Sequence, residues 1–306
     1  MNTHELPMMV FTLFAQMSVG AFVVLGIVQL VAARRYGREA VDKITDPVLY
    51  AIGPVMVLGL IASMFHMNDI GNTLNVLRHV ATSWLSREIV FGAGFAALGF
   101  LFAAAQWFRW GTSRQRQGLA ALTALVGLTL VWSMSMIYYS LVAVPAWNTW
   151  TTPAQFFTTT LLLGALSVGA ALMGTLTVRR RRPNPATTDL GDTTLIAGTL
   201  KGIGIAAVVL LGAEFLIIPL HIANLAGAGT AAATSAEVFT GAWFIARLVL
   251  VFLGAGLLAV LLFRYASPDT RPRTLAILTT AAFTLVLAGE LIARSQFYDS
   301  MTRIGM

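Results

Sequence analysis

The sequence predicts an all-α integral membrane protein with eight transmembrane helices. Of its 306 residues, 57% are hydrophobic and only 11% are charged, and the mean hydropathy is +0.78. A soluble domain carries roughly a quarter charged residues, so this chain lacks the polar side chains that would cover a water-facing surface. Its apolar residues also form eight long runs, most of them at or above the length of about 20 residues that crosses a bilayer.

Each run is expected to form one membrane-spanning helix, and together they account for almost the whole chain. The runs cover about residues 8 to 33, 47 to 67, 85 to 108, 118 to 141, 154 to 178, 197 to 221, 242 to 264 and 274 to 297. The first run is expected to remain as a span, because the N-terminal segment lacks the basic region of a cleavable signal peptide. Since the connections are short, residues 1–306 are interpreted as a single membrane domain.

Basic residues predict the orientation, because Lys and Arg near span ends are retained in the cytoplasm. Fifteen of the 20 Lys and Arg residues lie in the first, third, fifth and seventh connections. They are Arg34, Arg35, Arg38, Lys43, Arg109, Arg114, Arg116, Arg179, Arg180, Arg181, Arg182, Lys201, Arg264, Arg271 and Arg273. We therefore expect both termini on the outer side of the bacterial inner membrane.

The charge and the missing cysteines exclude several functions. The net charge of +7 comes from short basic clusters between apolar runs, which contact the lipid bilayer and do not form the basic face of a nucleic-acid-binding domain. No cysteine is present, so the chain has no disulfide, no thiolate zinc site and no iron–sulfur ligands of its own.

The two halves of the chain, 1–150 and 151–306, show weak self-similarity. The residues Ser18-Val19-Gly20-Ala21 match Ser167-Val168-Gly169-Ala170, and Pro7-x-x-x-Phe11-Thr12 matches Pro153-x-x-x-Phe157-Thr158. An even number of spans in each half makes these parallel repeats of four helices. Chance similarity between apolar segments is the alternative.

The few ionisable residues inside spans are the best candidates for functional or paired side chains, because burying them in hydrocarbon costs several kcal/mol. Glu290 and Arg294 are four residues apart, the spacing of an intrahelical ion pair. Glu214 and Arg247 are expected to pair across the bundle. Glu88 opens the third span, where a carboxylate either performs chemistry or interacts with the helix N-terminus.

His66 ends the second span and is followed by a polar connection that leads to Glu88. An imidazole and a desolvated carboxylate can both titrate near pH 7, so this pair suits proton transfer at a membrane surface. An interfacial histidine bonded to the backbone is the alternative. Ligation of one haem by His66 and His221 is a further hypothesis, but nothing else in the chain suggests a cofactor slot, and no haem and no metal site are expected.

Several segments resemble the DmsC family, the membrane anchor subunits of dimethyl sulfoxide reductase. They are the opening HELPMMVFTLFAQMSVGAF, the stretch from IASMFHMND through LSREI, VPAWNTWTTPAQFF, the GAE ending at Glu214, and AGELIARSQFY. Together with eight spans and outward termini, they extend the resemblance over essentially the whole chain.

This resemblance implies that the chain oxidises menaquinol, or a related quinol, in anaerobic respiration. It implies that electrons pass to an iron–sulfur subunit, expected to dock on the outer side, and then to a molybdenum-cofactor catalytic subunit. By motif, His66 and Glu88 correspond to the residues associated with the quinol site in that family. The chain departs from the family pattern at Met67–Ile70, where Gly and Pro often follow the histidine, and at Asn72, whose position can hold arginine.

Weaker candidates for contact with the quinol are Asn72, Arg78 and Tyr138. Arg78, with His79 beside it, either orients the quinol or is a solvent-exposed polar residue. Tyr138, or its neighbour Tyr139, either bonds a quinol oxygen or belongs to the interfacial aromatic belt.

Two alternative functions remain open at this point. One is a quinol subunit of the polysulfide- or nitrite-reductase type, which has similar spans but different loops. The other is a secondary transporter with Glu214, Arg247 and Glu290 along its path, for which helices broken at corresponding positions of both halves would be expected. The terminal electron acceptor belongs to another subunit, so this sequence does not identify it.

Overall fold

The computed structural model describes residues 6–64, 78–181 and 190–304. Within these residues the chain is helical apart from short turns and loops. The elements in chain order are α1 (Leu6–Tyr36), α2 (Arg38–Met64), α3 (Trp84–Trp107), α4 (Ser113–Tyr139), α5 (Thr151–Arg181), α6 (Leu190–Ala226), α7 (Thr230–Ala236), η3 (Glu237–Thr240), α8 (Ala242–Val251), η4 (Phe252–Leu258), α9 (Ala259–Tyr265) and α10 (Pro272–Asp299).

Eight helical segments in this part of the chain are long and apolar enough to cross a membrane, which confirms the predicted number of spans. The helix ends extend beyond the apolar runs. The α2 helix begins at Arg38, well before the predicted residue 47, because its charged first turns stay helical outside the apolar region. The α6 helix likewise reaches from Leu190 to Ala226.

The seventh span is composite, since α8 and α9 are joined by the π-helical segment η4. Gly254 in this segment packs on α10, where an added Cβ would lie 2.8 Å from the carbonyl oxygen of Ala282 and 2.7 Å from the side chain of Val286. Wider π turns of this kind mark local departures from the regular helical ladder. Hydropathy contains no signal for this change of winding.

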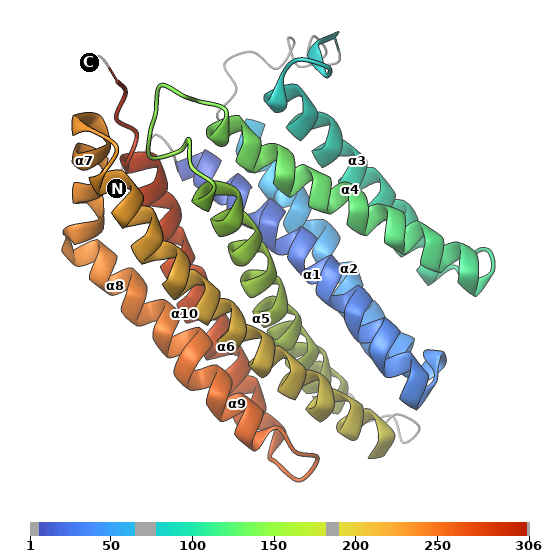
Figure 1. Ribbon diagram of the computed structural model, residues 1–306. Helices are drawn as coiled ribbons and strands as arrows, with labels where there is room; N and C mark the ends of the chain where they lie inside the picture. Colours follow the sequence, from blue (N-terminus) through green and yellow to red (C-terminus); the bar gives the residue numbers. More distant parts are fainter. Residues whose placement is uncertain (1–5, 65–77, 182–189, 305–306) are drawn as a thin grey trace.

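The helices form two groups, as Figure 1 shows, with α1 to α4 on one side and α5 to α10 on the other. The groups meet where α1 crosses α5. Gly20 and Gly164 allow this crossing, because a Cβ on Gly20 would overlap the carbonyl of Thr160 and a Cβ on Gly164 would overlap the backbone of Gly20. Small residues permit such close helix contacts in membranes. The proposed relation of the halves by a repeat stays a prediction.

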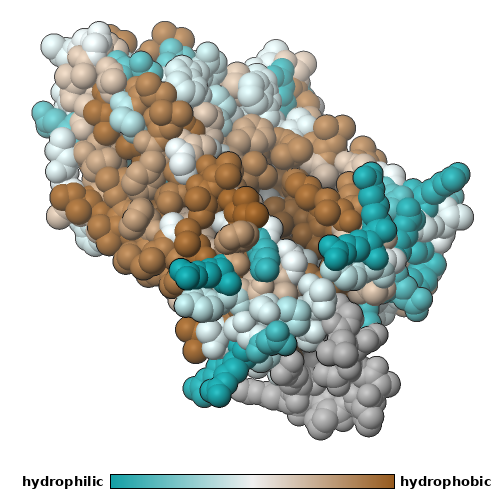
Figure 2. Space-filling model, turned by 60° about the horizontal axis from the view of Figure 1, so that its bottom comes forward, coloured by the Kyte–Doolittle hydropathy of each residue, from teal (hydrophilic) through white to brown (hydrophobic). Residues whose placement is uncertain are grey.

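The α1 helix begins and the α10 helix ends at the same end of the bundle, which is the upper end in Figure 1 and is called the terminal end below. Figure 2 is turned toward the opposite end, where hydrophilic residues gather beside the hydrophobic sides of the helices. The connection from α1 to α2 and the connection from α3 to α4 lie there. Their arginines are among the predicted cytoplasmic anchors, and the assignment of this end to the cytoplasm stays a prediction.

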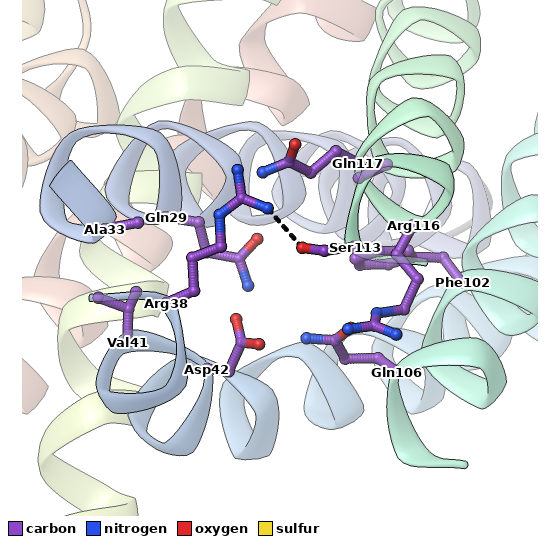
Figure 3. Close-up of a pocket in the computed structure, with 11 residues that line it drawn as sticks. Gln29, Ala33, Arg38, Val41, Asp42, Phe102, Gln106, Ser113, Arg116 and Gln117 are labelled. Carbon is purple, nitrogen blue, oxygen red and sulfur yellow. Dashed lines mark hydrogen bonds between the residues drawn. The ribbon is translucent and has the colours of Figure 1, made fainter. Parts of the chain in front are cut away.

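A polar network closes the opposite end of the first four helices. Arg109 bridges Asp42 and Asp46 at 3.0 and 3.3 Å. Figure 3 shows Arg38, at the start of α2, donating to the hydroxyl of Ser113 at the start of α4 beside a cavity of about 50 Å³. These arginines therefore join helices to one another in addition to any part they play in topology.

Candidate functional site

Glu88 lies in the second turn of α3 and is directed into the bundle. Its side chain is only 4% exposed. The helix cap is Ser83, whose side chain accepts a hydrogen bond from the backbone N–H of Ser86 at 3.3 Å. Glu88 is therefore not needed as a cap. The other alternative that the sequence left open for this residue, a chemical role, stays a prediction.

The neighbouring Arg87 points away from Glu88, toward the segment that precedes α3. Its guanidinium donates to the carbonyl oxygens of Val80 and Ala81 at 2.9 and 2.6 Å. It also lies over the ring of Trp84, 4.1 Å from the centroid. Adjacent side chains on a helix diverge. Arg87 therefore bonds to the segment before α3 and does not pair with Glu88.

Two tyrosines lie near Glu88, one from each group of helices. The hydroxyl of Tyr138, in the last turn of α4, is 2.8 Å from the hydroxyl of Tyr298 in the last turn of α10. The carboxylate of Glu88 interacts with both through electrostatics alone, since no hydrogen bond joins it to either tyrosine among the described residues. Glu88 and Tyr138, which are buried, and Tyr298, which is partly buried, thus form a polar group at the terminal end of the bundle, which we call the tyrosine site.

Aromatic rings fix Tyr138 in place. Its ring contacts those of Trp147, Phe156 and Phe297, with centroid distances of 5.0 to 5.8 Å. Trp147 in turn donates its indole N–H to the carbonyl of Phe297 at 2.8 Å. Tyr139, by contrast, is exposed at the surface. Tyr138 is therefore a component of the site, while Tyr139 is a surface residue.

Of the remaining predicted site residues, Arg78 is the one that the structure describes. Arg78 and His79 are exposed in a short turn before α3, where the carbonyl of His79 accepts bonds from the backbone of Thr82 and Ser83. His66 and Asn72 lie outside the described residues. Tyr298 was not singled out from the sequence, although its position four residues after Arg294 and eight after Glu290 places it on the same helical face.

A second set of buried charges lies in the other group of helices. Arg247 Nη2 is 2.8 Å from Glu214 Oε1, and both side chains are almost completely buried. This confirms the pair predicted across the bundle. The cost of burying two charges is offset only when they are paired and bonded, so this contact links α6 firmly to α8.

The predicted ion pair between Glu290 and Arg294 is wrong, since the described residues contain no such contact. Arg294 Nη2 donates instead to Gln16 Oε1 of α1 at 2.6 Å, and its guanidinium lies 4.1 Å from the ring centroid of Phe156. Glu290 accepts a bond from the hydroxyl of Thr159 at 2.7 Å. The long arginine side chain reaches neighbouring helices, and these distant partners replace the local carboxylate.

His221 lies near the end of α6 and is buried. Its Nδ1 is 2.8 Å from the hydroxyl of Thr151, and its ring contacts the edge of Phe239. One ring nitrogen is therefore engaged by the protein. Its suggested haem partner, His66, lies outside the described residues, so the haem hypothesis remains a sequence-based one.

Comparison with known proteins identifies related sequences. A family model described as DMSO reductase anchor subunit (DmsC) matches residues 1–299. An anaerobic dimethyl sulfoxide reductase polypeptide of Escherichia coli (strain K12) is 30% identical, covering 99% of this chain and 97% of the relative. A second polypeptide of the same type and organism, YnfH, is 29% identical with the same coverage. A sulfite dehydrogenase subunit of Allochromatium vinosum is 32% identical over 45% of each protein.

Proposed function

Since the chain belongs to the family of DMSO reductase anchor subunits, we propose that it oxidises menaquinol, or a related quinol, and passes the electrons to an iron–sulfur subunit. The family and the eight apolar helices make it a membrane anchor subunit. In the proposed complex, the iron–sulfur subunit docks at the terminal end, which faces outward from the bacterial inner membrane. A molybdenum-cofactor subunit then performs the terminal reduction in anaerobic respiration.

The buried carboxyl of Glu88, which interacts electrostatically with two mutually bonded tyrosine hydroxyls, is the observation that carries this proposal. Oxidation of a quinol removes two electrons and two protons, so the protein must bond the hydroxyl groups of a flat ring and accept protons from them. A carboxylate suits the second task, and the tyrosines suit the first. His66, from the connection that precedes Glu88, is proposed as the second proton acceptor.

The absence of cysteine supports direct transfer to a partner. Iron–sulfur clusters are held by thiolates, and this protein has none. Electrons released at the tyrosine site must therefore pass to a cofactor in another subunit. The site lies near the terminal end of the bundle, which is the position needed for a partner docked there.

Inhibitor binding tests the site assignment in membranes that contain the assembled complex. A quinol analogue should bind at least about 10-fold more weakly to Glu88→Gln and His66→Ala, as expected when a bond to a charged group is lost. The rate of quinol oxidation should also fall in both variants. Tyr139→Phe is the matched control, because it removes an exposed tyrosine hydroxyl next to the site. Unchanged affinity and turnover in both site variants would refute the assignment.

Two alternatives predict different results. The sulfite dehydrogenase relative favours a related complex in which another catalytic subunit uses the same type of membrane protein; identifying the copurifying catalytic subunit distinguishes these. A transporter should instead move its substrate when this protein alone is placed in liposomes. The α2 and α6 helices run unbroken through Pro54 and Pro219, so these two described spans lack the matching interruptions expected of transporter repeats.

A further inference from the structure

A small polar pocket lies inside the second group of helices, separate from the tyrosine site. Glu214 of α6, Arg247 of α8, and Glu290 with Arg294 of α10 line it, together with Thr159 of α5. We call it the four-charge pocket. Its cavity of about 20 Å³ exceeds the roughly 10–15 Å³ that one water molecule needs.

Each of the four charged side chains has one buried polar atom without a partner in the described part of the protein. Two are acceptors, Glu214 Oε2 and Glu290 Oε1, and two are donors, the Nε atoms of Arg247 and Arg294. Such buried groups carry a large energetic cost unless they are bonded. A water molecule both donates and accepts hydrogen bonds, so water in this pocket fits the unpartnered atoms.

Glu290 forms no ion pair with the other charged side chains that line the pocket. Arg247 pairs with Glu214 and Arg294 bonds to Gln16, while Glu290 has only the hydroxyl of Thr159 as donor among the described residues. Glu290 is only 2% exposed. Ionisable residues buried in membrane spans commonly mark ion or proton pathways.

A continuous polar face of α10 connects this pocket to the tyrosine site. Glu290, Arg294 and Tyr298 follow one another at intervals of four residues, which places them on one side of the helix. Tyr298 then bonds to Tyr138, within electrostatic range of Glu88. Polar side chains of α10 therefore lie between the two sites, Arg294 buried and Tyr298 partly buried.

We propose that the four-charge pocket is a hydrated proton-transfer site in which the Glu290 carboxylate accepts a proton derived from the quinol and returns it to pocket water. This inference rests on the proposed function. When the quinol becomes a quinone, its two O–H bonds break and two electrons leave for the iron–sulfur subunit. One of the two protons goes to His66, the second acceptor in the proposed function. The other passes from Glu88 through the tyrosine hydroxyls and pocket water to the Glu290 carboxylate.

Substitutions at Glu290 in the assembled complex separate proton transfer from a packing role. Glutamine has the shape of glutamate and can accept the bond from Thr159, but it cannot exchange a proton. Aspartate keeps the carboxyl group but shortens the side chain. Proton transfer therefore predicts faster quinol oxidation in Glu290→Asp than in Glu290→Gln, whereas packing alone predicts the reverse order.

The expected result for Glu290→Gln is a fall in kcat of about 10-fold or more, a larger solvent deuterium isotope effect, and unchanged affinity for the quinol analogue. Glu237→Gln is the control, because it neutralises an exposed carboxyl in η3. Should the Glu290 variants not assemble, Thr159→Val removes only the hydroxyl donor and should also raise the isotope effect.

Wild-type turnover and isotope effect in Glu290→Gln would overturn this inference while leaving the proposed function intact. If the Glu290 variants do not assemble, a wild-type turnover and isotope effect in Thr159→Val would lead to the same conclusion. A wild-type complex that neither binds nor oxidises quinol would instead refute the proposed function itself.

Discussion

The hydroxyl groups of Tyr138 and Tyr298 lie 2.8 Å apart, although the two residues are separated by 160 positions in the sequence. One belongs to the last span of the first group of helices and the other to the last span of the second. This contact joins the two groups next to Glu88. The position of the proposed quinol site therefore depends on both halves of the protein.

Removing either tyrosine hydroxyl should slow quinol oxidation without preventing assembly. We expect kcat/KM to fall roughly five-fold in Tyr138→Phe and in Tyr298→Phe, because a typical hydrogen bond contributes about 1 kcal/mol. The effects in the double variant should be less than multiplicative, because either single variant already breaks the bond between the two hydroxyls. Steady-state kinetics on the complex measure this coupling; two independent, multiplying effects would show that the hydroxyls act separately.

The ion pair between Glu214 and Arg247 should contribute to stability in a way that depends on both partners. Glu214→Gln leaves a buried guanidinium without its carboxylate, and breaking such a pair destabilises a protein by about 3–5 kcal/mol. Glu214→Gln with Arg247→Met should recover much of this loss. Equilibrium unfolding in detergent micelles measures both effects.

The pair between Asp42 and Arg109 is the matched control for this prediction. Half of the Arg109 side chain is exposed, and exposed pairs contribute about 0–1 kcal/mol. Asp42→Asn should therefore have a small effect. Equal losses in Asp42→Asn and Glu214→Gln would contradict the assigned difference between buried and exposed pairs.

The crossing of α1 and α5 should tolerate no added methyl group at Gly20. The new Cβ would overlap the carbonyl of Thr160, so Gly20→Ala should separate the helices and reduce the amount of folded protein in the membrane. Gly26→Ala on the same helix is the control, because nothing lies within 4 Å of its Cβ position. That change should be neutral or stabilise the helix by up to about 1 kcal/mol. Similar losses in both variants would refute the close crossing.

The sequence was sufficient to predict the number of spans, because an apolar run of the right length has no other stable arrangement in a bilayer. Helix ends were less predictable. Polar residues such as Arg38 continue α2 beyond its apolar run, and a hydrogen-bonded helix does not stop where hydropathy changes. The π-helical segment at Gly254 depends on packing against α10, which no local pattern records.

Charged partners were predictable only where few candidates existed. Glu214 and Arg247 are rare buried charges of opposite sign. Their pairing could be predicted because an unpaired charge inside a membrane span has a high free energy. Arg294 has a carboxylate four residues away but bonds to Gln16 near the other end of the sequence, because tertiary contacts override local spacing. Glu88 was proposed as a site residue from the sequence, which stays a prediction, while the contact of Tyr298 with Tyr138 required the fold.

The final prediction concerns the surface on which the iron–sulfur subunit is proposed to dock. Large apolar side chains are exposed in non-helical segments at the terminal end, including Val142, which is 72% exposed, and Ile304, which is 63% exposed. The backbone N–H of Ile304 donates to the carbonyl of Ala143 at 2.9 Å, so the C-terminal segment and the loop after α4 form one surface. Exposed apolar surface marks a site of contact with another protein or with the membrane, and we expect the iron–sulfur subunit to cover this one.

Charged substitutions on this surface should release the partner without disturbing the membrane domain. We expect Val142→Glu and Ile304→Glu to abolish copurification of the iron–sulfur subunit, because a carboxylate buried in an apolar interface is left unpaired. Val142→Thr, which nearly keeps the shape of the side chain, should retain the partner. Pull-down from detergent-solubilised membranes, with the amount of this protein measured in parallel, provides the test. Full retention of the iron–sulfur subunit by both glutamate variants would exclude this surface as its docking site.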